Sequence, residues 1–277
     1  MKMHHRLSVL LLAAWAAFVP ARAAEAPASA PSKPGEQLLQ ALLAGKTSQA
    51  EEVQIGRRIA GNLLGAAPLV ADETLQRYVN RVGRWVALQG ERPDLAWHFG
   101  VIDSEDINAF AAPGGYVFIT KGLYRRLNDE AELAGVLGHE IAHVQRKHHL
   151  KLLRQTQVIA ALGGLLGSKV KDEEQLVQNL IGNGAEIAAR SLDREAEHEA
   201  DRMGLVLAAR AGYDAYGLPA VLAEIGHVGR SDKRVSLLYK THPPPAERLT
   251  RLGEAAGDRL DTLAPGQDGS GRFYRLP

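Results

Sequence analysis

Two histidines and a glutamate stand at a spacing that suits metal-assisted hydrolysis. Residues 138–143 read Gly-His-Glu-Ile-Ala-His. On a helix, His139 and His143 project from one face one turn apart, so both imidazoles can bind a single zinc ion. Glu140 lies beside that face, where its carboxylate can take a proton from a zinc-bound water. The pattern therefore predicts a metal-dependent hydrolase in which Glu140 is the catalytic acid/base.

The motif is the HExxH signature of metalloproteases, and its surroundings favour a real site over a chance match. Apolar residues recur around it at helical spacing, which predicts an amphipathic and buried helix: Leu133, Val136, Leu137, Ile141 and Val144. Buried histidine and glutamate side chains without partners cost free energy, so a metal ion or other polar groups must satisfy them. The alternative is a pair of structural histidines.

A catalytic zinc needs a third protein ligand, and the first candidate is His149. The run HEIAHVQRKHH places this histidine at the metzincin spacing, HExxHxxGxxH. Arg146, however, stands where that pattern has a glycine, which turns freely into the left-handed region. Lys147 and His148 look like the solvated end of a helix. Met203 could stand for the metzincin Met-turn, but it lies in an acidic helical segment.

The second candidate is an acidic helix further along the chain. Glu197 and Asp201 are four residues apart and therefore lie on one face. Glu197 can bind the metal while Asp201 accepts a hydrogen bond from a ligand histidine. Glu195 and Glu199 are expected to be solvated, and His198 points about 100° away from Glu197. The alternative is that the whole acidic face is solvated.

Four sequence blocks resemble the HtpX-like zinc metallopeptidases, peptidase family M48, and especially their exported single-domain bacterial members. The blocks follow the family's order and span roughly residues 48–252: Asn108–Gly115, Gly138–His143, Arg194–Asp201, and Thr241–Pro243 with Arg248. One departure is Leu192, where relatives often have arginine after the serine that opens the glutamate helix. The resemblance implies a zincin-like α+β fold, mostly helical, with a small sheet and an active-site HExxH helix.

The resemblance also implies the roles of single residues. His139, His143 and Glu197 would bind one Zn²⁺ per chain, Glu140 would be the catalytic acid/base, and Asp201 would support a ligand. His242 matches a histidine that in some relatives approaches the zinc. It is a candidate donor to the oxyanion or a lock on the site. Alternatively, it is a structural histidine before three prolines.

The segment Asn108, Ala109 and Phe110, or the adjacent strand, is expected to form an edge that pairs with an extended peptide. Phe110 could instead be a core residue. The resemblance implies zinc-dependent endopeptidase activity on misfolded or misassembled envelope proteins. Two other functions remain open: a chaperone-like assembly factor with a latent or weakly active zinc site, and a purely structural metal site closed by His242.

Periodicity and capping residues predict the elements that must position these groups. Helices are expected from Ser48 to about Leu64, after Asp72, from Asp129 past His149, from Ser191 to about Ala209, and over Tyr216–Ile225. Alternating residues at Trp97–Val101 and a run at Tyr116–Thr120, after the turn Pro113–Gly115, predict a small sheet. This order of elements predicts an α+β domain.

Composition limits the chemistry and suggests export. The 277 residues include no cysteine, so a metal must be held by nitrogen and oxygen ligands. Residues 1–23 read as a signal peptide, with a basic start, an apolar run from Leu7 to Val19 and the cleavage site Ala21–Ala23; an uncleaved anchor is the alternative. Without Lys2, Arg6 and Arg22 the net charge changes from +1 to −2, which offers no basis for binding nucleic acid.

The expected organisation is a signal peptide at 1–23, a disordered Pro/Ala-rich leader at 24–47, a zinc metallopeptidase domain at 48–255 and a flexible tail at 256–277. The apolar stretch Val158–Gly167 is too short for a comfortable membrane span and favours a core helix or a hairpin at the membrane interface. The expected location is the periplasm. The sequence leaves peripheral membrane association and the oligomeric state open.

Overall fold

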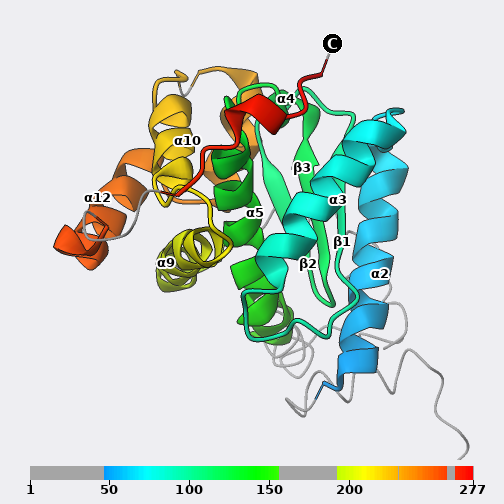
Figure 1. Ribbon diagram of the computed structural model, residues 1–277. Helices are drawn as coiled ribbons and strands as arrows, with labels where there is room; N and C mark the ends of the chain where they lie inside the picture. The colour runs from blue at the N-terminus through cyan, green and yellow to red at the C-terminus, as the bar shows by residue number, and fades with distance from the viewer. Residues whose placement is uncertain (1–46, 156–191, 230, 261–265, 277) are drawn as a thin grey trace, which may run out of the picture. The chain divides into compact units, whose positions relative to one another are not determined.

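The computed structural model describes residues 47–155, 192–229, 231–260 and 266–276 (Figure 1). The expected signal peptide, nearly all of the expected leader and the apolar stretch Val158–Gly167 lie outside the described residues.

A three-stranded sheet forms the β part of the domain. Its strands are β1 (His98–Ile102), β2 (Ala109–Ala112) and β3 (Tyr116–Thr120), in the order β1-β3-β2. β1 runs parallel to β3, and β2 runs antiparallel to it. Gly114 and Gly115 connect β2 to β3 with φ values of 78° and 100°, a left-handed backbone that glycine adopts without strain. The predicted small sheet and its turn are confirmed.

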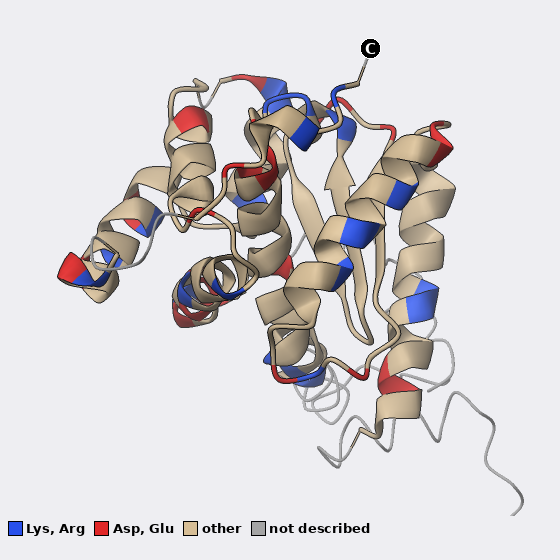
Figure 2. Ribbon diagram, in the orientation of Figure 1, with Lys and Arg blue, Asp and Glu red and all other residues tan. Residues whose placement is uncertain are grey.

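Helices cover both faces of this sheet (Figure 1). On one face, Phe110 and Phe118 pack with Ala60 and Leu63 of α2 (Gln49–Ala66). The other face packs against α3 (Glu73–Ala87) and α5 (Glu130–Gln145) through residues such as Phe99, Val101, Ala109, Ala111, Val117 and Ile119. A short helix, α4 (Lys121–Tyr124), follows β3 directly. Since both faces are covered, the three strands carry no charged residue and are uniformly tan in Figure 2.

The predicted helix starts are confirmed by their capping hydrogen bonds. Ser48 and Glu51 form a reciprocal capping box at the start of α2. The Asp72 carboxylate accepts from the backbone N–H of Leu75 at 3.0 Å, and Asp129 accepts in the same way at the start of α5. These side chains satisfy backbone donors that the first turn of a helix leaves free.

The helix predicted to run past His149 ends earlier, which corrects that prediction. α5 ends at Gln145 with Arg146 as its C-cap, and Lys147 takes a positive φ of 57°. The chain is then helical again over residues 148–155. The Lys147 ammonium lies 3.2 Å from the fully buried carboxylate of Glu52, an ion pair that helps offset the cost of the left-handed backbone. His148 is consequently buried rather than solvated.

The remaining helices form the other side of α5. They are α9 (Arg194–Arg210), α10 (Gly217–Gly226), α11 (Ser236–Thr241) and α12 (Pro245–Ala256), with short 3-10 turns at Lys233–Val235 and Gly257–Arg259. α9 crosses α5 where Gly138 faces Gly204, since a Cβ on either glycine would collide with the backbone of the other helix. The predicted helices at Ser191–Ala209 and Tyr216–Ile225 correspond to α9 and α10.

The C-terminal residues 266–276 pack on the domain, so the prediction of a flexible tail is wrong for them. Phe273 joins the main apolar core and stacks on Tyr124, with ring centroids 5.4 Å apart. Arg272 donates to the buried carboxylate of Glu130 at 2.8 Å, and that carboxylate also accepts from the hydroxyls of Tyr78 and Tyr213. The segment is rich in glycine and serine, which predicted a loose tail, but the side chains of Arg272 and Phe273 anchor it to the domain.

Figure 2 shows both acidic and basic residues on the outer helices. Within the parts of the chain that the structure describes, no helix is both long and apolar enough to cross a lipid bilayer.

Candidate metal centre

Four buried side chains from three parts of the chain converge on one point. His139 and His143 come from α5, Glu197 comes from the first turn of α9, and His242 caps the C-terminal end of α11. Each offers one ligand atom, and these atoms all lie within 4.8 Å of one another. The structure therefore brings together the two histidines and the glutamate that the sequence pointed to, and His242, the candidate donor or lock, lies beside them.

The individual distances show how close the four groups are. The Nε2 atoms of His139 and His143 are 3.0 Å apart. Glu197 places Oε1 3.5 Å from Nε2 of His143 and Oε2 3.7 Å from Nε2 of His139. His242 contacts the same carboxylate, with Nδ1 2.6 Å from Oε2.

This donor set fits a divalent metal ion. His139 and His143 both use Nδ1 for other partners, Asp201 and His148, so their Nε2 lone pairs face one another. Glu197 Oε1 is buried and has no hydrogen-bond partner among the described residues. A cation between the two rings would satisfy all three atoms, and nitrogen with carboxylate oxygen is a common ligand set for zinc.

The electrostatics favour the protonation states that bind metal. Burial alone would raise the pKa of Glu197, but the nearby His242 and His139 lower this pKa to about 2. Burial and the neighbouring His139 hold the pKa of His143 well below its ordinary value. At neutral pH the carboxylate is thus ionised and the imidazole neutral, which are the ligating forms.

Glu140 lies beside the convergence point. It is fully buried in α5 and, with His139, His242 and Ala109, lines a small cavity of about 30 Å³. Burial raises the pKa of its carboxyl group above the ordinary value. A raised pKa suits a group that must take up a proton and release it again.

Asp201 contacts His139, the histidine that it is expected to support. Its carboxylate lies 2.9 Å from Nδ1 of His139. It also accepts from Nε and Nη2 of the buried Arg248, at 3.0 and 2.5 Å. Burial would raise the pKa of Asp201, but the Arg248 guanidinium and His139 hold it well below its usual range. Sequence reasoning had placed Arg248 in a family block without giving it a role.

The alternative third ligand, His149, is not part of the converging set. Its ring is buried, 5.7 Å from the His143 ring between centroids. Arg146 occupies the C-cap of α5, and Met203 accepts from its Nε at 2.9 Å instead of lying beneath the site. His198 is buried, with Nε2 3.8 Å from Glu247. The metzincin arrangement therefore does not describe this site.

The expected peptide edge is divided between three environments. Asn108 is fully buried, and both polar atoms of its side chain lack hydrogen-bond partners among the described residues. Ala109 lines the small cavity with Glu140. Phe110 packs against α2 and is a core residue, the alternative that the sequence had left open. β2 itself is an edge strand of the described sheet.

An HExxH helix against a small sheet, with a glutamate from a second helix completing the donor set, defines a zincin-like metallopeptidase domain. Residues 73–256 match the model of Peptidase family M48, and this chain belongs to that family.

Curated relatives agree with this assignment. The chain is 32% identical to the beta-barrel assembly-enhancing protease of Escherichia coli K12 over 215 residues, which cover 74% of this chain and 44% of the relative. It is 30% identical to the Yersinia pestis protein of the same name, over 81% of this chain and 47% of the relative. Mitochondrial metalloendopeptidase OMA1 of Schizosaccharomyces pombe is 28% identical, over 64% and 52%. The chain thus spans about half the length of these relatives.

Proposed function

We propose that the protein is a zinc-dependent endopeptidase. The observation that carries the proposal is the convergence of His139, His143 and Glu197 on one point, with Glu140 in the adjoining cavity. A site that only binds metal has no need of a buried carboxyl group at this position. The family and the names of its relatives, a protease and a metalloendopeptidase, support the same activity.

In this proposal His139, His143 and Glu197 hold the ion, and Asp201 fixes the ring of His139. Zinc bound there would polarise the scissile carbonyl and lower the pKa of water. Glu140 takes the proton from the attacking water and returns it to the leaving amine, a double role that its raised pKa supports. Arg248 keeps Asp201 ionised and in place.

His242 is proposed to act as a removable lock. Its Nδ1 lies 2.6 Å from Glu197 Oε2, and its ring lines the small cavity with Glu140, so we propose that it takes up space that water and substrate would need. Burial would lower the pKa of His242, but the Glu197 carboxylate raises it above the ordinary value. A hydrogen bond from the His242 imidazolium would then compete with the metal for that carboxylate oxygen. Donation to the oxyanion is the competing role.

The proposed substrates are misfolded or misassembled envelope proteins in the periplasm, reached through the signal peptide at 1–23. Two relatives are named for enhancing β-barrel assembly, which motivates this substrate class. β2 is an edge strand of the described sheet and lies beside α5, and we propose that an extended chain pairs with it, since main-chain pairing recognises backbone rather than sequence. The buried amide of Asn108, which directly precedes this strand and lacks a hydrogen-bond partner among the described residues, is proposed to contribute polar contacts to the peptide.

The alternative function is a chaperone-like assembly factor with little hydrolysis, and one comparison separates the two. Casein digestion by purified protein is measured with and without a chelator, for wild type and Glu140→Gln. The peptidase proposal expects chelator to abolish digestion and the substitution to slow it by about 10²–10⁴-fold, with zinc still bound. Glu224→Gln, an exposed glutamate on α10, is the matched control. Equal digestion by wild type and Glu140→Gln would overturn the catalytic assignment.

A further inference from the structure

The second ring nitrogen of His143 faces another histidine. Its Nε2 points into the donor set, and its Nδ1 lies 2.9 Å from Nδ1 of His148. A neutral imidazole has one N–H, and Nε2 must keep its lone pair free to bind a metal. The proton of His143 therefore sits on Nδ1, from which it donates to Nδ1 of His148.

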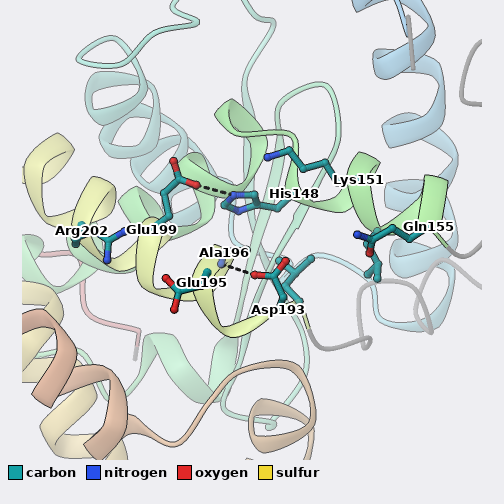
Figure 3. Close-up of a pocket in the computed structure, with 10 residues that line it drawn as sticks. His148, Lys151, Gln155, Asp193, Glu195, Ala196, Glu199 and Arg202 are labelled. Atoms are coloured by element: carbon teal, nitrogen blue, oxygen red, sulfur yellow. Dashed lines mark hydrogen bonds and ion pairs between the residues drawn. The ribbon is translucent and has the colours of Figure 1, made fainter. Parts of the chain in front are cut away.

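Placing the proton of His143 on Nδ1 also determines the tautomer of His148. If Nδ1 of His148 accepts, its own proton is on Nε2, which lies 3.3 Å from Oε2 of Glu199. Glu199 is held in turn by Arg146, whose Nε is 2.8 Å from Oε1. Figure 3 shows Glu199 directed at His148 along one wall of a cavity of about 300 Å³. The chain of contacts runs from His143 through His148 to a carboxylate on α9.

The break after α5 makes this contact geometrically available. In a continuous helix, residues five apart are rotated by about 140° and face different directions. Here Lys147 takes a φ of 57°, and the next helical segment begins at His148. The turn brings the His148 ring to 5.1 Å from the ring of His143, between centroids, and almost fully buries it.

We propose that His148 and Glu199 are positioning residues for His143, as Asp201 is for His139. These contacts, from His143 through His148 to Glu199, are called the relay. The relay holds the His143 ring in the tautomer and orientation that present Nε2 to the metal. Groups of this kind typically change metal affinity by about 10–100-fold when they are removed. The inference rests on the proposed metal site, and it assigns a role to two residues that sequence reasoning had placed on solvated surfaces.

Two substitutions at one position separate hydrogen bonding from packing. In His148→Gln, the amide oxygen can still accept from His143 and the amide nitrogen can donate to Glu199. In His148→Leu, a side chain of comparable bulk can do neither. Zinc affinity is measured by competition with a chromophoric chelator, and the visible absorption spectrum of the Co²⁺ form reports ligand geometry. His227→Gln, at an exposed position, is the matched control.

The relay predicts that His148→Leu lowers zinc affinity by about 10–100-fold and alters the Co²⁺ spectrum, whereas His148→Gln stays within a few-fold of wild type. Wild-type affinity in His148→Leu, or equal losses in both variants, would overturn the relay. Should His148→Leu not fold, Glu199→Ala at a half-exposed position replaces it. A drop in affinity supports the relay, and an unchanged affinity refutes it. Failure of the wild-type protein to bind any metal would instead refute the proposed function.

Discussion

A Cβ atom on Gly204 of α9 would lie 2.6 Å from the backbone nitrogen of His139 in α5. A Cβ on Gly138 would lie 2.7 Å from the carbonyl oxygen of Gly204. The two helices therefore meet backbone to backbone at His139, one of the proposed metal ligands. Because Glu197 is on the same helix as Gly204, this contact sets the separation between the histidines and the glutamate.

Gly204→Ala is expected to separate α9 from α5, lower zinc affinity and destabilise the fold by about 1–3 kcal/mol, as overpacking does. Helix propensity alone would change stability in the opposite direction, since alanine is favoured over glycine by about 1 kcal/mol. Gly253→Ala on α12 is the control, because its Cβ would meet nothing within 4 Å. Urea unfolding and chelator competition measure both effects. Stabilisation of Gly204→Ala would contradict the close crossing.

Arg248→Met is expected to leave the buried Asp201 carboxylate uncompensated. Breaking a buried ion pair from one side costs about 3–5 kcal/mol, and both residues are at most 5% exposed. Adding Asp201→Asn should restore part of the loss, because the double variant no longer buries an unpaired charge. A double-mutant cycle by urea unfolding gives the coupling. If the two substitutions lowered the free energy of unfolding by strictly additive amounts, Arg248 and Asp201 would not be energetically coupled.

The metal-free protein is expected to lose stability in acid through Asp201. Since its folded pKa lies below the ordinary value, this carboxyl group contributes stability that is present above about pH 4, the unfolded pKa. That contribution is lost as the pH falls from there through the lower pKa of the folded state. Urea midpoints in chelator between pH 7 and pH 3 measure the slope. Asp201→Asn should have a shallower slope below pH 4.5, and an identical slope would contradict the assignment.

His242→Ala is expected to increase casein digestion by zinc-loaded protein, because it removes the imidazole that contacts Glu197 and lines the small cavity with Glu140. Zinc affinity should be retained within about tenfold, since three ligands remain. Initial rates and chelator competition are measured on the same samples. Complete loss of digestion with zinc still bound would instead assign His242 to the oxyanion.

Phe273→Ala is expected to destabilise the domain by about 3–4 kcal/mol, the lower part of the range for buried phenylalanine. Phe273 is 9% exposed and contacts Tyr124 and Tyr78. Leu88→Ala, at a position 55% exposed, should change stability by less than about 0.5 kcal/mol. Thermal unfolding compares the two. If both substitutions changed stability by the same small amount, the C-terminal residues would not contribute to the core.

Local periodicity predicted the parts of the site that depend on a single helix. His139 and His143 share one face of α5, and Glu197 and Asp201 share one face of α9, so spacing alone paired them. The contact between His242 and Glu197 depends on how α11 and α9 pack, which no local pattern encodes. The contact between Arg248 and Asp201 likewise depends on how two helices pack, so the sequence predicted no partner for Arg248, although it lies in one of the four family blocks.

The two errors in the fold have physical causes. The break after α5 depends on Lys147, a residue type that rarely adopts positive φ and is paired here with the distant Glu52. The C-terminal segment has a composition typical of a loose tail, but Arg272 and Phe273 anchor it to Glu130 and the core. In both places a long-range contact overrides the local preference.

The chain has no cysteine and so cannot join distant segments through a disulfide. Its donor set nevertheless draws on α5, α9 and the end of α11, which are far apart in sequence. An ion held by these groups is a removable cross-link that stabilises only the folded state, by about 2.7 kcal/mol at a free metal concentration one hundred times the Kd. Loading and unloading the site would therefore change how readily the domain itself unfolds.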